Sequence, residues 1–312
     1  MARCHELLRG AIDLHTHSAP SLFDRLLDDV GLAEQARDAG MRAVLYKAHE
    51  QDTTGRAALV RRAVPGIQAF GGLVLNHVAG GLNPAAVEAS IGLGARMVWM
   101  PTMSAAHHIA FFGGSHFGPR MPAASGVAQA AGRSRRERTN DKTSTRPTPP
   151  GLAVLDEGGA LRPEVHEILG LIAEAGICLS TGHLSPREIR VLVPAARTAG
   201  VTRVLVTHPD LALSGMGIDE QTALAEAGAT LEKDVNTLGP PWHSTTLERM
   251  IQSIRAVGPA RCVLATDYGQ LHSPAPVDGL RIFVQLCLEQ GISDAEIRTM
   301  AAENPARLLG LD

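Results

Sequence analysis

Short apolar runs rich in Val, Ile and Leu alternate along the chain with stretches of helical character. Gly, Pro, Asp and Ser often stand at the junctions between the two kinds of segment. This alternation favours parallel strands joined by crossover helices. Eight strands are predicted, over residues 11–16, 42–48, 68–76, 95–100, 177–182, 202–207, 229–235 and 261–266.

Two of the predicted helices carry explicit start signals. Ser185-Pro186-Arg187-Glu188 offers a cap, a first-turn proline and a capping-box glutamate, and Ser293-Asp294-Ala295-Glu296 repeats the box. Glycines 40, 176 and 200 stand where helices should end. Eight strand-then-helix units most simply close into a (β/α)8 TIM barrel, whose functional residues collect at the carboxyl ends of the strands. A doubly wound open sheet is the alternative.

One interval, residues 103–162, breaks this alternation after the fourth predicted strand. A loop of that length is typical of an active-site lid or a disordered insert. Its basic run (Arg133, Arg135, Arg136 and Arg138) predicts a solvated face, with anion binding as the alternative. Residues 152–161 predict a β-hairpin that turns at Gly158-Gly159. This hairpin would cover the mouth of the barrel.

Composition and charge narrow the classes of partner. The chain has 312 residues, of which 45% are hydrophobic and 20% charged, and its formal net charge is −3. This length suits a single barrel domain over residues 1–312, with 103–162 inserted into it. A general nucleic-acid binder would need a clustered excess of Lys and Arg, so nucleic acid is excluded as a partner. Small molecules are the expected partners.

The cysteines and the N-terminus indicate the compartment. The four cysteines are scattered without a Cys-x-x-Cys pair, which suits neither a disulfide framework nor a thiolate zinc site. The N-terminal residues lack the apolar run of a signal peptide, and no stretch approaches the roughly 18 apolar residues of a membrane span. We therefore expect a soluble, cytoplasmic protein without a membrane partner.

Histidines gather at the predicted strand ends. Thirteen histidines are present, and those at or just beyond the carboxyl end of a predicted strand are His15, His17, His49, His77, His183 and His208. Each alone is often an ordinary hydrogen-bonded residue, but core packing gives no reason for imidazoles to collect there. Asp267, after the last strand, adds a carboxylate at the same rim. Several nitrogen ligands and an acid are the equipment of a catalytic metal with an open position for water.

These residues carry a resemblance to a known superfamily. Asp13-Leu14-His15-Thr16-His17, His183, His208, Asp267 and the late Asn304–Gly310 segment look like the amidohydrolase superfamily of metal-dependent hydrolases, over nearly the whole barrel. Tyr46–His49, Leu75–His77 and Thr266–Gln270 resemble an uncharacterised amidohydrolase-like group within it. The resemblance implies that His15 and His17 hold a first metal ion and that His183 and His208 hold a second. It also implies that Asp267 ligates the first ion and moves the proton, and that the protein is a homo-oligomer.

Lys47 marks a departure from the superfamily pattern. In binuclear members a carboxylated lysine or a glutamate on strand 4 bridges the ions, but the fourth predicted strand, 95–100, ends in Met97-Val98-Trp99-Met100 and offers neither. Lys47 on strand 2 is the nearest replacement, and it shares a strand face with His49, so that both can point into the metal site. Three roles stay open for Lys47: a carboxylated bridging ligand, an ammonium that binds a substrate carboxylate or phosphate, or a structural partner of an acid. One or two divalent ions are expected, zinc first, with manganese or iron as alternatives.

The predicted reaction is hydrolysis of an amide, cyclic amide or lactone by metal-activated water. Asp267 would accept the proton and return it to the leaving group. His77, His49 or the pair His107-His108 would donate to the developing oxyanion, although the pair is more typical of surface residues. His243 is a second-choice substrate contact, with solvent exposure favoured.

Three other functions are alternatives to this hydrolase. The first is a phosphoesterase of the PHP type, although those enzymes tend to have a histidine two residues after the final aspartate, where Gly269 stands here. A metal-dependent decarboxylase of aromatic acids is the second. A non-enzymatic metal-binding protein is the third, and the acid beside open coordination argues against it.

Overall fold

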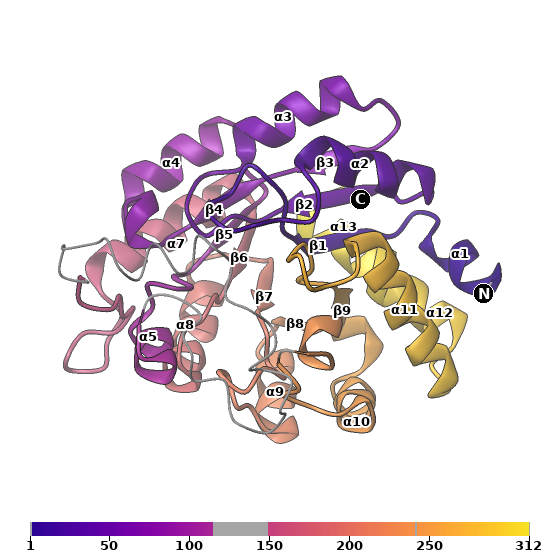
Figure 1. The fold of residues 1–312 in the computed structure, drawn as a ribbon. Coiled ribbons are helices and arrows are strands. Elements are labelled where there is room, and N and C mark those ends of the chain that lie inside the picture. The colour runs from indigo at the N-terminus through magenta and orange to yellow at the C-terminus, as the bar shows by residue number, and fades with distance from the viewer. Residues whose placement is uncertain (1, 115–148, 241, 312) are drawn as a thin grey trace.

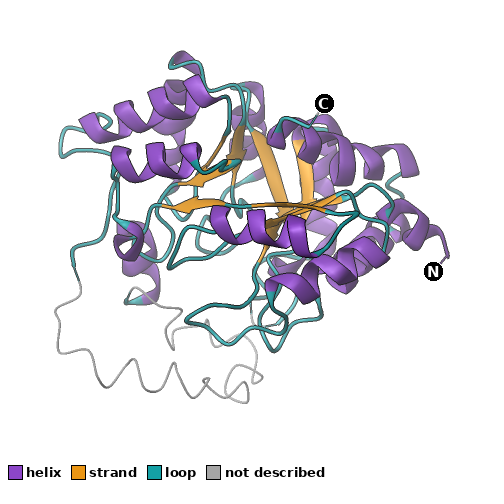
Figure 2. Ribbon diagram, turned by 90° about the horizontal axis from the view of Figure 1, so that it is seen from above, coloured by secondary structure: helices purple, strands orange, loops and turns teal. Residues whose placement is uncertain are grey.

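The computed structural model describes residues 2–114, 149–240 and 242–311. Its strands lie at the centre, and helices surround them in both views (Figures 1 and 2). All neighbouring strands pair in parallel, in the orders β1-β2-β3 and β4-β5-β6-β7-β8-β9. The strands are β1 (Ile12–Thr16), β2 (Ala43–Tyr46), β3 (Gln68–Phe70), β4 (Gly72–Val74), β5 (Met97–Trp99), β6 (Cys178–Ser180), β7 (Val204–Val206), β8 (Thr230–Asp234) and β9 (Cys262–Ala265).

The third predicted strand, 68–76, is divided at Gly71 into β3 and β4. β3 pairs with β2 and β4 pairs with β5, so the two halves together hold one position in the barrel. The Thr53 backbone passes so close to Gly71 that a Cβ there would lie 2.4 Å from the Thr53 carbonyl oxygen. Thr53 also exchanges hydrogen bonds with the backbone of Gly72. The strand breaks because an adjacent loop occupies the space beside it.

The barrel closes between its first and last strands. The Asp267 amide donates to the His15 carbonyl over 2.9 Å, and the His17 amide donates to the Tyr268 carbonyl over 2.8 Å. The buried Asp13 carboxylate accepts from the Thr266 hydroxyl across the same seam, over 2.6 Å. Burial raises the pKa of Asp13 to about 7, although the hydrogen bonds that its carboxylate accepts from Thr266 and from the His15 amide lower it. The predicted TIM barrel is confirmed, and an open sheet would not join these two strands.

Helices cover the outside of the strands. Both predicted capping boxes are present, at Ser185 and Ser293, and glycines 40, 176 and 200 have positive φ at or next to helix ends. The helices are α1 (Ala2–Leu8), α2 (Asp29–Asp38), α3 (Thr54–Ala63), α4 (Pro84–Gly92), α5 (Ala106–Phe112), α7 (Pro163–Ala175), α8 (Pro186–Thr198), α9 (Ile218–Glu226), α10 (Leu247–Val257), α11 (Pro276–Glu289), α12 (Asp294–Arg298) and α13 (Asn304–Leu309). Short 3-10 turns cover His77–Ala79, Val235–Thr237 and Pro259–Arg261, and a π-helical turn covers Thr299–Glu303.

Side chains alternate between two apolar layers along each strand. On β2, Ala43 and Leu45 belong to the cluster inside the barrel, whereas Val44 and Tyr46 pack in the larger cluster between strands and helices. Tyr46 is fully buried, and its hydroxyl donates to the Asp29 carbonyl at the start of α2. Lys47 follows at the next inward position, because successive strand side chains point to opposite faces. Polar residues that continue the inward series past the apolar layer therefore meet at the carboxyl end of the barrel.

A β-bulge in β1 changes this alternation where the histidines begin. The register of β1 against β2 shifts between Asp13 and Thr16, so β1 contains one extra residue. Leu14 joins the inner apolar cluster, and the next residue, His15, still reaches the inward-facing Glu232 of β8. The bulge brings His15 into the barrel, a result that simple alternation from Leu14 does not predict.

The part of the 103–162 insertion that the structure describes packs on the barrel. α5 lies in it, and Leu155 and Leu161 form an antiparallel bridge around the predicted turn at Gly158-Gly159. The Val154 amide donates to Glu188 near the start of α8. The basic run at 133–138 lies outside the described residues. The predicted lid role and the single-domain organisation stay predictions.

Candidate metal centre

His15 and His17 are buried at the end of β1, and both are held through Nδ1. His15 Nδ1 donates to Glu232 Oε1 over 3.0 Å, and His17 Nδ1 donates to the Lys47 carbonyl over 2.8 Å. A carboxylate or carbonyl oxygen only accepts, so these contacts assign a proton to each Nδ1. Each ring therefore presents Nε2 to the centre of the barrel mouth, an arrangement typical of metal-binding histidines.

His208 repeats this arrangement from β7. Its Nδ1 donates to Asp234 Oδ2 over 2.8 Å, and its ring centroid lies 4.9 Å from that of His15. His208 has a φ of 51° and Asp267 has a φ of 53°, in the left-handed region that side chains other than glycine rarely adopt. Backbone strain of this kind is concentrated at functional sites. Here it occurs at these two residues, which follow β7 and β9. Among the described residues other than glycine, the exposed His243 also has a positive φ, of 36°.

Asp267 joins the two β1 histidines. Its Oδ1 lies 3.0 Å from His15 Nε2 and 3.0 Å from His17 Nε2. Its Oδ2 accepts from Asn236 Nδ2 over 2.9 Å. The Asp267 side chain is 16% exposed, whereas those of His15 and His17 are 0% and 1% exposed. Ligands around one tetrahedral zinc ion stand about 3.3 Å apart when each bond is about 2.05 Å, so these three atoms fit a single ion.

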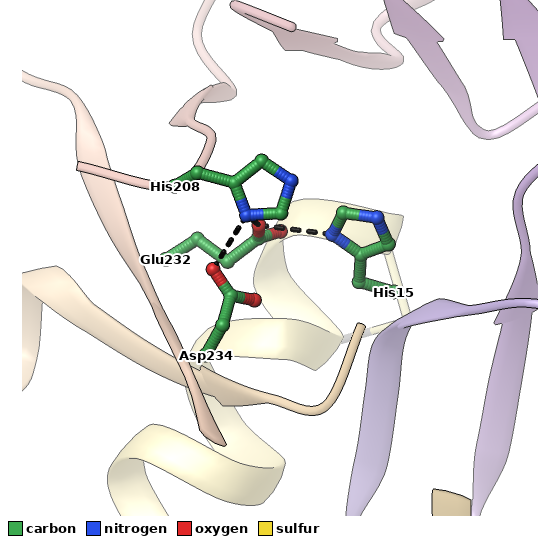
Figure 3. Close-up of side chains that lie close together, drawn as sticks. All are labelled: His15, His208, Glu232 and Asp234. Carbon is green, nitrogen blue, oxygen red and sulfur yellow. Dashed lines mark hydrogen bonds and ion pairs between the residues drawn. The ribbon is translucent and has the colours of Figure 1, made fainter. Parts of the chain in front are cut away.

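A second group of ligand atoms lies deeper in the barrel. His15, His208, Glu232 and Asp234 each offer one atom, and these atoms lie within 4.8 Å of one another. Figure 3 shows their four side chains pointing toward one another. His15 belongs to both groups, so the two candidate positions for an ion share it.

β8 supplies the oxygen ligands that the sequence analysis missed. Glu232 and Asp234 face inward, and Asn236 continues the same period of two. Lys233 faces outward and donates to Gln221 on α9, to Ser253 on α10 and to Asp210 in the loop after β7. One side-chain oxygen of each inward residue, Glu232 Oε2, Asp234 Oδ1 and Asn236 Oδ1, is buried and has no hydrogen-bond partner among the described residues. Buried polar groups are nearly always paired, and Glu232 and Asp234 belong to one group of converging ligand atoms, so their unpaired oxygens fit a cation. The missed signal is a polar residue at every second position of a buried strand.

The ionisation of the cluster favours a positive charge at its centre. Burial and the nearby Lys47 lower the pKa of His15, but Asp267 and Glu232 outweigh them and raise it to about 10. Burial raises the pKa of Asp267, but the charge of His15 and the hydrogen bonds of both histidines hold it well below its usual value. Burial lowers the pKa of His17 to about 3. A proton on His15 supplies the positive charge that a bound metal ion would supply.

Lys47 lies inside this cluster. Its Nζ is 2.9 Å from His15 Nε2, and burial lowers its pKa. Within the described part of the chain, no carboxylate oxygen lies within ion-pairing distance of Nζ. The third role considered above, a structural ion pair, therefore gains no support from the geometry.

His49 and His183 form the other side of the histidine ring. His49 Nδ1 is 2.9 Å from Thr102 Oγ1, and its ring stacks on His17 with the centroids 5.1 Å apart. His183 Nδ1 is 2.8 Å from His108 Nδ1, and its centroid lies 5.6 Å from that of His208. His183 thus lies beside the predicted second metal position but belongs to neither group of converging ligand atoms.

The four other histidines considered from the sequence fall in three different environments. His77 is half-buried on a 3-10 turn, its Nε2 lies 2.9 Å from the Pro150 carbonyl oxygen, and its predicted catalytic role gains no support from the geometry. His108, expected at the surface, is fully buried beside His183, because α5 packs onto the barrel. His107 is half-buried and contacts the Leu213 carbonyl, and His243 is exposed as favoured.

Comparisons with known proteins agree on the fold. The model of a family described as "Family of unknown function (DUF6282)" matches residues 10–232. No curated protein sequence matches the chain. An amidohydrolase from Pseudomonas aeruginosa is similar in structure, with a TM-score of 0.61, 12% identity and coverage of 98% of both chains.

Two further solved structures have the same fold. A lactonase from Listeria monocytogenes gives a TM-score of 0.55 at 12% identity, covering 98% of this chain and 96% of its own. An organophosphorus hydrolase from Deinococcus radiodurans gives 0.54 at 12% identity, covering 97% and 94%. The resemblance to amidohydrolases stated from the sequence is thereby confirmed at the level of the fold.

Proposed function

The chain belongs to the family of unknown function DUF6282, and we propose that it is a metal-dependent hydrolase that cleaves an amide, cyclic amide or lactone bond of a small molecule. One observation carries the proposal. Asp267 Oδ1 stands 3.0 Å from two imidazole Nε2 atoms, and Asp267 is the most exposed of these three side chains. A carboxylate at the open side of a set of metal ligands is placed to exchange protons with a substrate.

His15, His17 and Asp267 are the proposed ligands of the first ion, and His208, Glu232 and Asp234 are the nearest candidates for a second. A bound divalent ion supplies an activated water at neutral pH and polarises the electrophilic oxygen of the substrate. Zinc suits the mixed imidazole and carboxylate donors best, with manganese or iron as alternatives. His49 and His183 line the opposite side and would contact the substrate or complete the coordination.

Asp267 is the proposed proton carrier. Its Oδ1 faces the β1 histidines, while Asn236 holds Oδ2 through a 2.9 Å hydrogen bond. The carboxylate is thereby fixed in orientation, and its low pKa keeps it in the ionised form, which a proton acceptor must have before turnover. Returning that proton to the leaving nitrogen or oxygen completes the hydrolysis.

Lys47 is the proposed site of carboxylation. Only a neutral amine attacks carbon dioxide, and burial lowers the pKa of Lys47, which favours that form. Formation of the N–C bond to carbon dioxide releases one proton and yields a carbamate whose oxygens lie beside His15 Nε2. Extra electron density beyond Nζ at high resolution, and a 13C carbamate signal after growth on labelled bicarbonate, would support this. A bare Nζ in the metal-loaded protein would leave the ammonium role in its place.

A substrate screen with metal-reconstituted protein tests the function. Amides, lactones, phosphoesters and aromatic acids are compared, with product analysis to separate hydrolysis from decarboxylation. Metal-dependent turnover of amides or lactones supports the proposal. Turnover confined to phosphoesters or to loss of carbon dioxide would favour one of the two alternative enzymes. A purified protein that neither contains nor takes up a divalent ion would rule out the proposal and leave the metal histidines unexplained.

The assembly and location of the protein are proposals too. We propose a homo-oligomer in the cytoplasm that acts on small molecules. None of the helices of residues 2–114, 149–240 and 242–311 is long and apolar enough to span a membrane. Sedimentation of the purified protein tests the oligomer.

A further inference from the structure

Lys233 is a buried cation on the outer side of β8. Its side chain is 0% exposed, and its Nζ donates to Asp210 Oδ2 over 2.9 Å, to Gln221 Oε1 over 2.6 Å and to Ser253 Oγ over 2.8 Å. An ammonium has three protons, and each of them here has an acceptor. Replacing a buried ion pair by well-packed apolar side chains is often neutral or stabilising, so stability alone does not explain this pair.

The ion pair fastens the loop that follows His208. Asp210 lies two residues after His208, and its other carboxylate oxygen, Oδ1, accepts from Gln221 Nε2 over 3.0 Å. The same nitrogen donates to the Met216 carbonyl over 3.3 Å, at the far end of the loop. Two points of the loop are thus joined to α9, and Asp210 is also joined to β8 through Lys233.

A cavity lies beside the same loop. It has a volume of about 140 Å³, and residues 209–212, 215 and 216 form one of its sides. Roughly 10–15 Å³ is enough to hold one water molecule, so the packing on this side leaves the loop room to shift. The hydrogen bonds of Asp210 are therefore needed to fix the position of the loop.

His208 depends on such support because its backbone is strained. Its φ of 51° lies in a region that residues other than glycine rarely adopt, and strain of this kind persists where the surrounding structure holds it. Inside the barrel, His208 Nδ1 donates to Asp234 over 2.8 Å. Outside the barrel, Lys233, the residue before Asp234, holds Asp210. β8 therefore holds the imidazole from the inner side and the following loop from the outer side.

We propose that Lys233 and Asp210 are positioning residues, which hold His208 in its left-handed conformation with its ring among the ligand atoms of the second candidate ion position. The inference rests on the proposed metal-dependent hydrolase and concerns how one of its metal ligands is set in place. Without the ion pair the loop after β7 can shift, and the backbone of His208 can relax. The hydrogen bond from His208 to Asp234 is then lost, and with it the inward position of the ring.

The test replaces the ion pair by apolar side chains of similar size, in a double variant that carries Asp210→Leu and Lys233→Met. Gln221 keeps its hydrogen bonds to the Met216 carbonyl and to Ser253, so none of these groups loses its last partner. The double variant should therefore fold, and its thermal unfolding midpoint checks this. Lys233→Met alone would leave a buried carboxylate without its counter-charge, so the double variant is the one measured.

The first measurement is made on metal-free protein. The Nδ1 proton that His208 donates to Asp234 should give a proton NMR signal far downfield, assigned by its absence in His208→Gln. We expect the double variant to lose this signal, because the released proton exchanges with water. The signal of His17, which donates to the Lys47 carbonyl instead, should remain.

The second measurement is the affinity for zinc, by competition with a chelator. Backbone strain of the usual size corresponds to a factor of roughly 10 to 100, so the double variant should bind zinc more weakly by about that factor. The control carries Arg190→Gln and Glu220→Gln, which together remove an ion pair at the surface between α8 and α9. It should keep both the His208 signal and the affinity for zinc.

Every other outcome decides against one of the two proposals. In a protein that binds zinc, a double variant that keeps either the His208 signal or the full affinity overturns the inference. A double variant that does not fold, or a control that shows the same losses, overturns it too. Loss of the His208 signal in a protein that neither binds zinc nor hydrolyses any substrate would refute the hydrolase and keep the positioning role. Hydrolysis of lactones at equal rates with and without the ion pair would do the reverse.

Discussion

Oδ1 of Asp267 lies 3.0 Å from Nε2 of His15, although His15 is on the first strand of the barrel and Asp267 follows the last. The backbone joins the same two residues, since the Asp267 amide donates to the His15 carbonyl. Closure of the barrel and assembly of the candidate metal centre are therefore one structural event. A change that opens the β1–β9 seam should disturb both.

The histidines of β1 should decide metal content. His17→Ala removes one of the three atoms that converge on the first ion position. We therefore expect the affinity for the metal to fall by at least about tenfold, and the metal content of the purified protein to fall with it. His243→Ala, which changes an exposed imidazole, is the control and should keep full metal content. Elemental analysis after dialysis measures both. Equal metal in the two variants would move the site away from His17.

Asp267→Asn should abolish most turnover while metal binding is retained. Asparagine has nearly the same shape and tolerates the left-handed backbone conformation at this position, so the fold should be retained. It cannot accept the proton, and we expect turnover to fall by roughly 10²- to 10⁴-fold while the histidines still bind metal, more weakly. Activity assays with measured metal occupancy test this. Unchanged turnover at full occupancy would remove the proton-transfer role.

Glu232 should act by positioning His15. Its carboxylate accepts from His15 Nδ1 and so makes Nε2 a better ligand, and a neutral amide in its place should lower metal affinity by about 10- to 100-fold. Glu232→Gln is compared with Glu248→Gln, an exposed residue of α10. Competition with a coloured chelator gives the two affinities. A loss that appears in both variants would point to overall charge as the cause.

Metal uptake should depend on pH through His15. In the metal-free protein its pKa is raised to about 10, so at neutral pH a proton occupies the ring and must leave when the metal binds. Affinity should therefore rise with pH, by up to about tenfold per unit for one displaced proton, and level off as pH approaches that pKa. Calorimetry in buffers of different ionisation enthalpy counts the released protons. A pH-independent affinity without proton release would contradict the shifted pKa.

The residues that bear chemistry were largely predictable because their signals are local. Strand ends follow from apolar runs and turn residues, and parallel strands place their carboxyl ends on one rim, so His15, His17, His183, His208 and Asp267 could be expected there together. The capping boxes at Ser185 and Ser293 depend on residues three apart, and both form. Each of these features is specified within a few residues of sequence.

Other features depend on contacts between distant strands, and only the tertiary structure decided them. The approach of Lys47 to His15, the pairing of His183 with His108 and the division of a strand at Gly71 each require the position of a second segment. The sequence alone determined the barrel and the rim that carries the histidines, because periodicity and turn chemistry act locally. Which of those side chains converge was decided by the bulge in β1 and the closure of β9 on β1, because register between strands is a property of the whole barrel.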